Sequence, residues 1–330
     1  MNQLAQTRSD PQAGISDPQA SISDPQAVMD HHAKSFSWAA KFLSSKARTD
    51  AALLYAFART ADDYADEEDL GSPQERAHAL QVLRSQALNT TLQTDSLAGQ
   101  TGHMLRRYGV PDAVLATLMD SLQADAGPRQ MDTTEDLLQF AYGVAGTVGQ
   151  MMRPLLGAPG QADAYAIALG VGMQLTNIAR DVVEDAQRGR CYIPAQWGVS
   201  QQVLATPQDA AQRTQAFAAL RRLLALADDF YAFAHAGISV IPRHNRRAIR
   251  IASSLYQGIG HKIVRLGEAR YWGGRVSLTN AEKVRLLSHT LLLPTMPGKA
   301  AARDVWHNDL SHLAGMPGFP AMTAITALAS

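Results

Sequence analysis

The chain has 330 residues, of which 46% are hydrophobic, so it can enclose one large core or two modest ones. Its 30 Lys and Arg residues balance its 30 Asp and Glu residues, which excludes a strong global attraction for nucleic acid and leaves any electrostatic function to local clusters. The single cysteine, Cys191, excludes an internal disulfide framework and fits a reducing cytoplasm.

The first predicted element is a disordered tail over residues 1–29. The pentapeptide Ser-Asp-Pro-Gln-Ala starts at Ser9, Ser16 and Ser23. Proline in every unit interrupts a helix, and the sparse apolar content offers little surface to bury in a core. The N-terminus lacks a basic segment followed by an apolar run, and no uninterrupted apolar stretch in the chain approaches ~18 residues. We therefore expect neither a secretory signal nor a membrane-spanning helix.

Residues 30–293 show a helical pattern, and β-type alternation with hairpin turns is scarce. The clearest expected helices cover 136–156, 164–185, 210–234, 246–266 and 281–293. We predict one all-α domain over 30–293. Beyond Pro294 the composition shifts to Pro, Gly, Ala and Thr, so residues 294–330 are expected to form a loosely docked C-terminal tail.

The first acidic row follows the apolar stretch 51–58 and contains Asp62 and Asp66, with Arg59 beside them. Positions i and i+4 of an α-helix share a face and lie about 6 Å apart along the axis, so the two aspartates should point the same way. An isolated Asp-x-x-x-Asp pair is typical of a solvated surface helix. The pair therefore indicates a functional site only if a second group of oxygen ligands occurs elsewhere in the chain.

The second acidic row supplies that partner, with Asn177, Asp181 and Asp185 at successive i+4 positions and Arg180 among them. Repulsion between close carboxylates costs stability unless a cation is bound. Oxygen ligands suit Mg²⁺, which shares its coordination between carboxylates and substrate phosphates. Two rows that face each other across a cavity would hold a diphosphate through bridging Mg²⁺ ions, with Mn²⁺ as a substitute.

Glycines interrupt two apolar helical segments. Gly143, Gly146 and Gly149 lie in the first, and Gly170 and Gly172 lie just before the second acidic row. Each interior glycine costs roughly 1 kcal/mol relative to alanine, so some other interaction must compensate. Either a neighbouring helix approaches closely, or the missing side chains leave room for a long apolar ligand. The occurrence of two such helices favours a ligand channel.

A diphosphate site beside an apolar channel is what an isoprenoid diphosphate requires. Mg²⁺ and arginines would neutralise the departing diphosphate. The allylic carbocation left behind needs a dry cavity, and aromatic faces stabilise it by cation–π attraction. The aromatic candidates are Phe36, Tyr55, Tyr142 and Tyr256.

Several segments resemble the squalene/phytoene synthase family of head-to-head isoprenyl diphosphate synthases, over nearly the whole helical domain. The most specific is 174–194, which resembles the second aspartate-rich signature of the family, and 54–66 resembles the first. Residues 144–149 match a third motif, and Lys34-Ser35-Phe36 is similar to the substrate-entry motif. Two positions depart from the pattern, because Ala33 and Phe140 stand where the family often has serine and tyrosine.

The resemblance implies an isoprenoid synthase fold, a single helical domain around a central apolar cavity. It implies Mg²⁺ ligands at Asp62, Asp66, Asn177, Asp181 and Asp185. It implies catalytic contacts from Tyr55, Arg59, Arg180 and Tyr192, and substrate contacts from Lys34, Ser35, Phe36, Tyr142, Gln174, Arg190, Tyr256 and Arg275.

The implied reaction joins two geranylgeranyl diphosphates through a cyclopropylcarbinyl diphosphate to phytoene, a step of carotenoid biosynthesis, with diphosphate released. Three alternatives remain open. The first is a C15 enzyme that makes squalene or dehydrosqualene from farnesyl diphosphate. The second is a terpene cyclase, although its second row usually ends in glutamate after serine or threonine. The third is a noncatalytic member of the family that acts as an assembly protein.

The implied partners follow from this chemistry. The ligand is a prenyl diphosphate, no nucleic acid is expected, and no NADPH is expected beside Mg²⁺. We expect a cytoplasmic protein, peripheral to the inner membrane, because an apolar product must reach a bilayer. Downstream carotenoid enzymes are further candidate partners.

Overall fold

The computed structural model describes residues 25–32, 34–66, 68–91, 95–207 and 209–292, together with positions 313, 315, 316, 318 and 319. For residues 30–32, 34–36 and 68 the description is of the backbone. Residues 1–24 and most of 293–330, and with them most of both predicted tails, lie outside the described residues.

The described chain is built from helices, which confirms the all-α prediction. In order they are α1 (Pro25–His32), α2 (Lys34–Ala40), α3 (Ser45–Asp66), η1 (Glu68–Leu70), α4 (Pro73–Leu88), α5 (Leu97–Arg107), α6 (Asp112–Asp125), α7 (Thr134–Ala141), the π-helix η2 (Tyr142–Gly146), α8 (Thr147–Leu155), η3 (Gly160–Ala162), α9 (Asp163–Gln187), η4 (Ala195–Trp197), α10 (Gln201–Ala205), α11 (Ala210–Gly237), η5 (Ile238–Val240), α12 (Arg243–Leu266), α13 (Glu268–Tyr271) and α14 (Asn280–Leu292).

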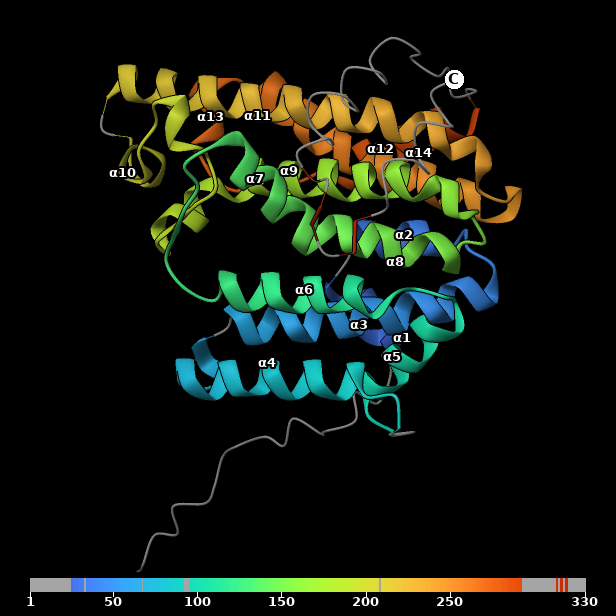
Figure 1. The fold of residues 1–330 in the computed structure, drawn as a ribbon. Coiled ribbons are helices and arrows are strands. Elements are labelled where there is room, and N and C mark those ends of the chain that lie inside the picture. The colour runs from blue at the N-terminus through green and yellow to red at the C-terminus, as the bar shows by residue number, and fades with distance from the viewer. Residues whose placement is uncertain are drawn as a thin grey trace, which may run out of the picture.

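The helices stack in layers around α9 (Figure 1). Helices α3, α4, α5 and α6 enclose one hydrophobic cluster together with α8, and a second, larger cluster surrounds α9, α11 and α12. Alanine and glycine make α9 thin, so α8, α11 and α12 can all pack against it. The central helix therefore carries its polar residues into the space between the two clusters.

Two very short strands fix the end of α9 to the end of α6. β1 (Arg129–Gln130) pairs in parallel with β2 (Arg190–Cys191), with Arg129 opposite Arg190. Gly189 precedes β2 with a φ of 83°, a left-handed conformation that side chains other than glycine rarely adopt. This turn brings the chain back beside α6 immediately after the second acidic row.

The glycine-bearing helices lie in close contact with one another. A Cβ added to Gly149 would lie 2.1 Å from the carbonyl oxygen of Ala166, and one added to Gly170 would lie 2.2 Å from that of Ala145. These glycines allow η2 and α8 to press directly on the backbone of α9. Close helix packing therefore fills the space where their side chains would lie, while Gly149 and Gly170 also line the cavity described below.

The N-terminal prediction is wrong for residues 25–29, which begin helix α1. Proline is tolerated in the first turn of a helix, where its missing N–H has no partner in any case. Met29 is buried and packs with Ala40 and Ala52. At the other end of the chain, Leu313 is buried and the ring of Phe319 meets that of Tyr142 edge-on, with centroids 5.5 Å apart.

One helical stretch, Ala210–Val240 (α11 with η5), has the length and hydropathy of a membrane span among the described residues. Half of its most apolar window is buried inside the fold, and α11 packs along α9. That burial is what a core helix of a folded domain provides.

Candidate active site

The cavity of about 690 Å³ lies between the two hydrophobic clusters and falls within the usual range for small-molecule sites. Its walls come from α3, α8, α9 and α12, with contributions from α2, α6 and β2. Acidic side chains gather at one end and apolar side chains at the other. The acidic end contains Asp62, Asp66, Asn177, Asp181 and Asp185.

The first row stands on the last turns of α3. Arg59 Nη1 donates to Asp62 Oδ2 at 3.2 Å, and Arg59 also pairs with Asp63. Burial in the cavity, followed by the charges of Asp66 and Asp63, raises the pKa of Asp62 to about 7, although 43% of this side chain faces open space. Part of this row therefore carries a proton near neutral pH unless a cation is present.

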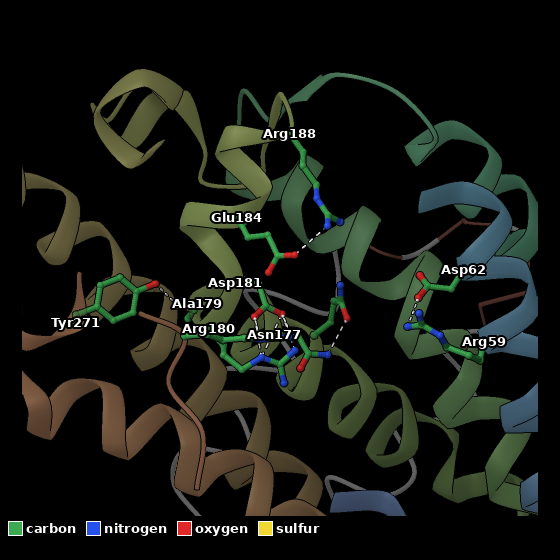
Figure 2. A network of polar contacts seen from close by, with 11 residues as sticks. Arg59, Asp62, Asn177, Ala179, Arg180, Asp181, Glu184, Arg188 and Tyr271 are labelled. Atoms are coloured by element: carbon green, nitrogen blue, oxygen red, sulfur yellow. Dashed lines mark hydrogen bonds and ion pairs between the residues drawn. The ribbon is translucent and has the colours of Figure 1, made fainter. Parts of the chain in front are cut away.

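The second row stands on α9 and faces the first (Figure 2). Arg180 forks around Asp181, with Nε 2.9 Å from Oδ1 and Nη2 2.5 Å from Oδ2. Arg275, from the segment after α13, approaches the same carboxylate, with Nε 2.7 Å from Oδ1. Asp181 is thus held by two arginines, and both of them also line the cavity.

Asn177 and Gln174 occupy the turn before Asp181. Asn177 Nδ2 donates to Gln174 Oε1 at 3.4 Å, while Asn177 Oδ1 is buried without a hydrogen-bond partner in the described structure. An unsatisfied buried carbonyl oxygen is costly and requires an explanation. Its place in the acidic row identifies it as an oxygen that a bound cation would satisfy.

The two rows are electrostatically coupled. Arg190, at β2, donates from Nη1 to Asp66 Oδ1 at 2.5 Å. Burial and the charge of Asp181 are the main causes that raise the pKa of Asp185 to about 7, and Asp66 on the opposite row adds to the effect. Carboxylates from α3 and α9 therefore repel one another across the cavity.

Tyr192 belongs to a cluster that sequence reasoning did not find. Its hydroxyl donates to Asp125 Oδ2 at 2.6 Å, and its ring stacks on Phe140 with centroids 4.7 Å apart. Asp125 is buried at the last residue of α6, and burial raises its pKa to about 6. A carboxylate at the C-terminal end of a helix is unfavourable, because that end of the helix dipole is negative. The position of Asp125 at the end of α6 was therefore the signal in the sequence that pointed to a special role.

Asp125→Asn should lower turnover by about 10- to 100-fold, the loss typical when a residue that orients a metal-site ligand is removed. The reason is that Asp125 holds Tyr192 and lies within electrostatic reach of Arg190, which contacts Asp66. The measurement is steady-state turnover against Mg²⁺ concentration, with the half-saturating concentration expected to rise. Asp120→Asn, on the exposed face of α6, is the matched control. Equal activity in both variants would contradict the assignment.

The apolar part of the cavity begins beyond the acidic rows. Tyr55 and Tyr256 line it from α3 and α12, and burial raises the pKa of Tyr55 to about 12, so both rings stay neutral. Leu43, Leu156 and Ile241 line the far end. A long apolar chain whose head lies at the aspartates would run along these side chains.

Tyr142 is the candidate that the structure does not bring to the cavity. It is fully buried on the other side of η2, where its hydroxyl lies 3.5 Å from Gln150 Oε1 and its ring meets Phe319. Phe140 and Val144, four residues apart, line the cavity instead. Lys34, Ser35 and Phe36 lie on α2, and their side chains are outside the described residues.

The acidic rows do not form a closed metal site by themselves. Within the described residues, no three His, Cys, Asp or Glu side chains already converge as a metal-binding group. Ion pairs explain this, because Asp62, Asp66 and Asp181 each hold an arginine. The donors still fit Mg²⁺, since they are oxygens, two of their pKa values are raised, and Asn177 Oδ1 lacks a partner.

The sequence comparisons agree with this geometry. The squalene/phytoene synthase family model matches residues 29–282. A 15-cis-phytoene synthase of Enterobacter agglomerans is 33% identical over 273 residues, covering 78% of this chain and 91% of that protein. A 15-cis-phytoene synthase of Pantoea ananas is 34% identical over 271 residues, covering 77% of this chain and 86% of that protein.

The fold comparisons point the same way. A dehydrosqualene synthase solved in complex with a ligand superposes with a TM-score of 0.69 at 25% identity, covering 81% of this chain and 94% of that one. The squalene synthase HpnC of Alicyclobacillus acidocaldarius superposes with a TM-score of 0.61 at 21% identity, covering 73% and 92%, and supports the fold. The chain belongs to the squalene/phytoene synthase family of head-to-head prenyltransferases.

Proposed function

We propose that this prenyltransferase joins two geranylgeranyl diphosphates head to head, through a cyclopropylcarbinyl diphosphate, to phytoene, and releases diphosphate in an Mg²⁺-dependent reaction. The observation that carries the proposal is the pair of acidic rows on α3 and α9 at one end of an apolar cavity. Relatives named 15-cis-phytoene synthase that match most of the chain support the C20 substrate.

The residues proposed to hold Mg²⁺ are Asp62, Asp66, Asn177, Asp181 and Asp185. When bound, the ion neutralises negative charge on the departing diphosphate. The arginines around the rows have a second role. Arg180 and Arg275 flank Asp181 and Arg190 flanks Asp66, so each stands where diphosphate oxygens would meet the cavity wall.

The remaining side chains suit a carbocation. The walls beyond the rows are mostly apolar, and Tyr55, Tyr256 and Phe140 present aromatic rings to the cavity. Such rings attract a cation without acting as nucleophiles, and the raised pKa of Tyr55 keeps its hydroxyl protonated. These residues would exclude water from the allylic cation and hold the second substrate's double bond beside it.

The decisive experiment is product analysis with purified protein. C15 and C20 prenyl diphosphates are supplied separately, each with and without NADPH, and each with Mg²⁺ or with EDTA. We expect a C40 product from the C20 substrate that requires Mg²⁺ and does not respond to NADPH. Loss of Mg²⁺ should reduce diphosphate release to background, and full activity in EDTA would overturn the metal assignment.

A C15 reaction is the second candidate, and the fold similarity to a dehydrosqualene synthase favours it. A C30 product would retain the two-row chemistry and change the substrate, and a response to NADPH would separate squalene from dehydrosqualene. Release of no diphosphate from either substrate would instead support the noncatalytic assembly role.

A further inference from the structure

Several stretches of this electrically balanced chain contain no acidic residue, and three of them approach one another in the fold. These three are 31–49, 137–162 and 230–267, in a chain whose 30 acidic residues among 330 average one in 11. The third stretch alone contains six Arg and Lys residues. Positive charge is therefore concentrated in segments that are far apart in the sequence.

The fold brings parts of these three stretches together. The α2–α3 turn, the end of α8 and the start of α12 meet at the right-hand end of Figure 1. Asn245, which is 2% exposed, joins them: Ser44 N donates to Asn245 Oδ1 at 3.0 Å, and Asn245 Nδ2 donates to the Leu156 carbonyl at 3.1 Å. These hydrogen bonds fix the positions of the three segments relative to one another at this end of the molecule.

Four exposed basic side chains mark this surface, which we call the basic end: Lys41, Arg243, His244 and Arg247. In the described part of the chain, no ion pair involves any of them. Arg246 differs, because its guanidinium bonds the Ile241 carbonyl. Val240, 39% exposed, is a large apolar side chain just before this group. Unpaired cations next to an exposed apolar side chain suit an interface that is both anionic and apolar.

The apolar end of the cavity lies in the same segments. Leu43 lines the cavity two residues after Lys41, and Ile241 lines it two residues before Arg243. The acidic rows lie at the opposite end, because α9 begins at Asp163 and reaches Asn177 roughly 20 Å further along its axis. The cavity therefore has an acidic end and an apolar end, and Lys41 and Arg243 lie close in the sequence to residues that line the apolar end.

We propose that the basic end docks on an anionic lipid bilayer, with the apolar end of the cavity towards the membrane. Lys and Arg residues close to an anionic leaflet each strengthen binding by about fivefold. The bilayer suits this surface better than nucleic acid does, since the cations border apolar residues and the chain has no net charge. That the apolar product leaves by this end rests on the proposed function, whereas the docking itself does not.

The test is flotation of the purified full-length chain with vesicles of phosphatidylcholine alone or phosphatidylcholine mixed with phosphatidylglycerol. We expect binding to the anionic vesicles that weakens with added salt. The triple variant Lys41→Gln/Arg243→Gln/Arg247→Gln should bind them about 100-fold more weakly, because three cations are lost. Diphosphate release in detergent should be unchanged, which separates failure of docking from failure of the proposed function.

The matched control is Arg213→Gln/Arg221→Gln/Arg285→Gln, which removes the same charge from exposed positions on α11 and α14. It should bind anionic vesicles like the unmodified protein. Equal weakening in both triple variants would overturn the proposal, as would equal binding to uncharged vesicles. Tighter binding to a DNA duplex than to anionic vesicles would also overturn it and identify a nucleic-acid surface.

Discussion

Asp185→Asn should lower diphosphate release by at least about 100-fold, the loss typical when one preorganised electrostatic group is removed, and should stabilise the metal-free protein. Both effects have one cause. The carboxylate of Asp185 is crowded by Asp181, Glu184 and Asp66, which is tolerable only when a cation is bound. The measurements are turnover with Mg²⁺ and thermal unfolding in EDTA.

The stabilising effect should depend on pH with a definite sign. Burial and neighbouring acids raise the pKa of folded Asp185 to about 7, above its unfolded value of about 4. Between these values the folded state binds more protons than the unfolded state, so the unmodified protein loses stability as pH rises. The gain from Asp185→Asn should therefore appear between pH ~4 and ~7 and reach on the order of 1 kcal/mol, since water in the cavity screens these charges.

Asp181→Asn is the informative comparison. It should lose activity to a similar extent, but its folded state should be weakened by about 1–3 kcal/mol, because the carboxylate accepts hydrogen bonds from Arg180 and Arg275. The sequence alone predicts that removing Asp62 or Asp181 leaves the fold intact, because it indicates only the repulsion between the acids. Stabilisation by both Asp181→Asn and Asp185→Asn would show that these arginine contacts contribute nothing, and destabilisation by both would mark the rows as structural.

The sequence predicts the long helices of the second half of the chain closely, since strong apolar periodicity dictates them. The stretch 164–185 becomes α9 (Asp163–Gln187), and 246–266 becomes α12 (Arg243–Leu266). The second helix starts earlier than predicted because Pro242, a poor residue within a helix, is well suited to precede one. Local signals of this kind need no knowledge of the partner helix.

The candidate site is only partly predictable, because it depends on contacts between segments that are far apart in the sequence. The i+4 spacing places the acidic rows, but nothing local shows that Asp125 meets Tyr192, because the pairing of β1 with β2, distant in the sequence, brings the end of α6 to β2. The structure does not bring Tyr142 to the cavity, for a related reason. Its motif places it near the site, yet its side of η2 faces Gln150 and Phe319. Side-chain direction there depends on packing between distant segments.

The glycines offer the sharpest test of packing against channel formation. Gly170→Ala should destabilise the protein by about 1–3 kcal/mol or more, the usual cost of overpacking a filled interior. A Cβ at this position would lie 2.2 Å from the Ala145 carbonyl oxygen, so α9 and η2 would have to separate. This cost exceeds the roughly 1 kcal/mol that alanine gains over glycine as a helix former.

Gly160→Ala is the control, because a Cβ there meets nothing within 4 Å and the residue is exposed in η3. Its stability should be unchanged or slightly raised, since alanine restricts the unfolded chain. Thermal unfolding and the KM for the prenyl diphosphate are measured for both variants. If the missing side chain at Gly170 instead made room for substrate, Gly170→Ala would keep its unfolding midpoint and raise KM. A lowered midpoint, with KM unchanged in the protein that remains folded, is the result that helix packing requires.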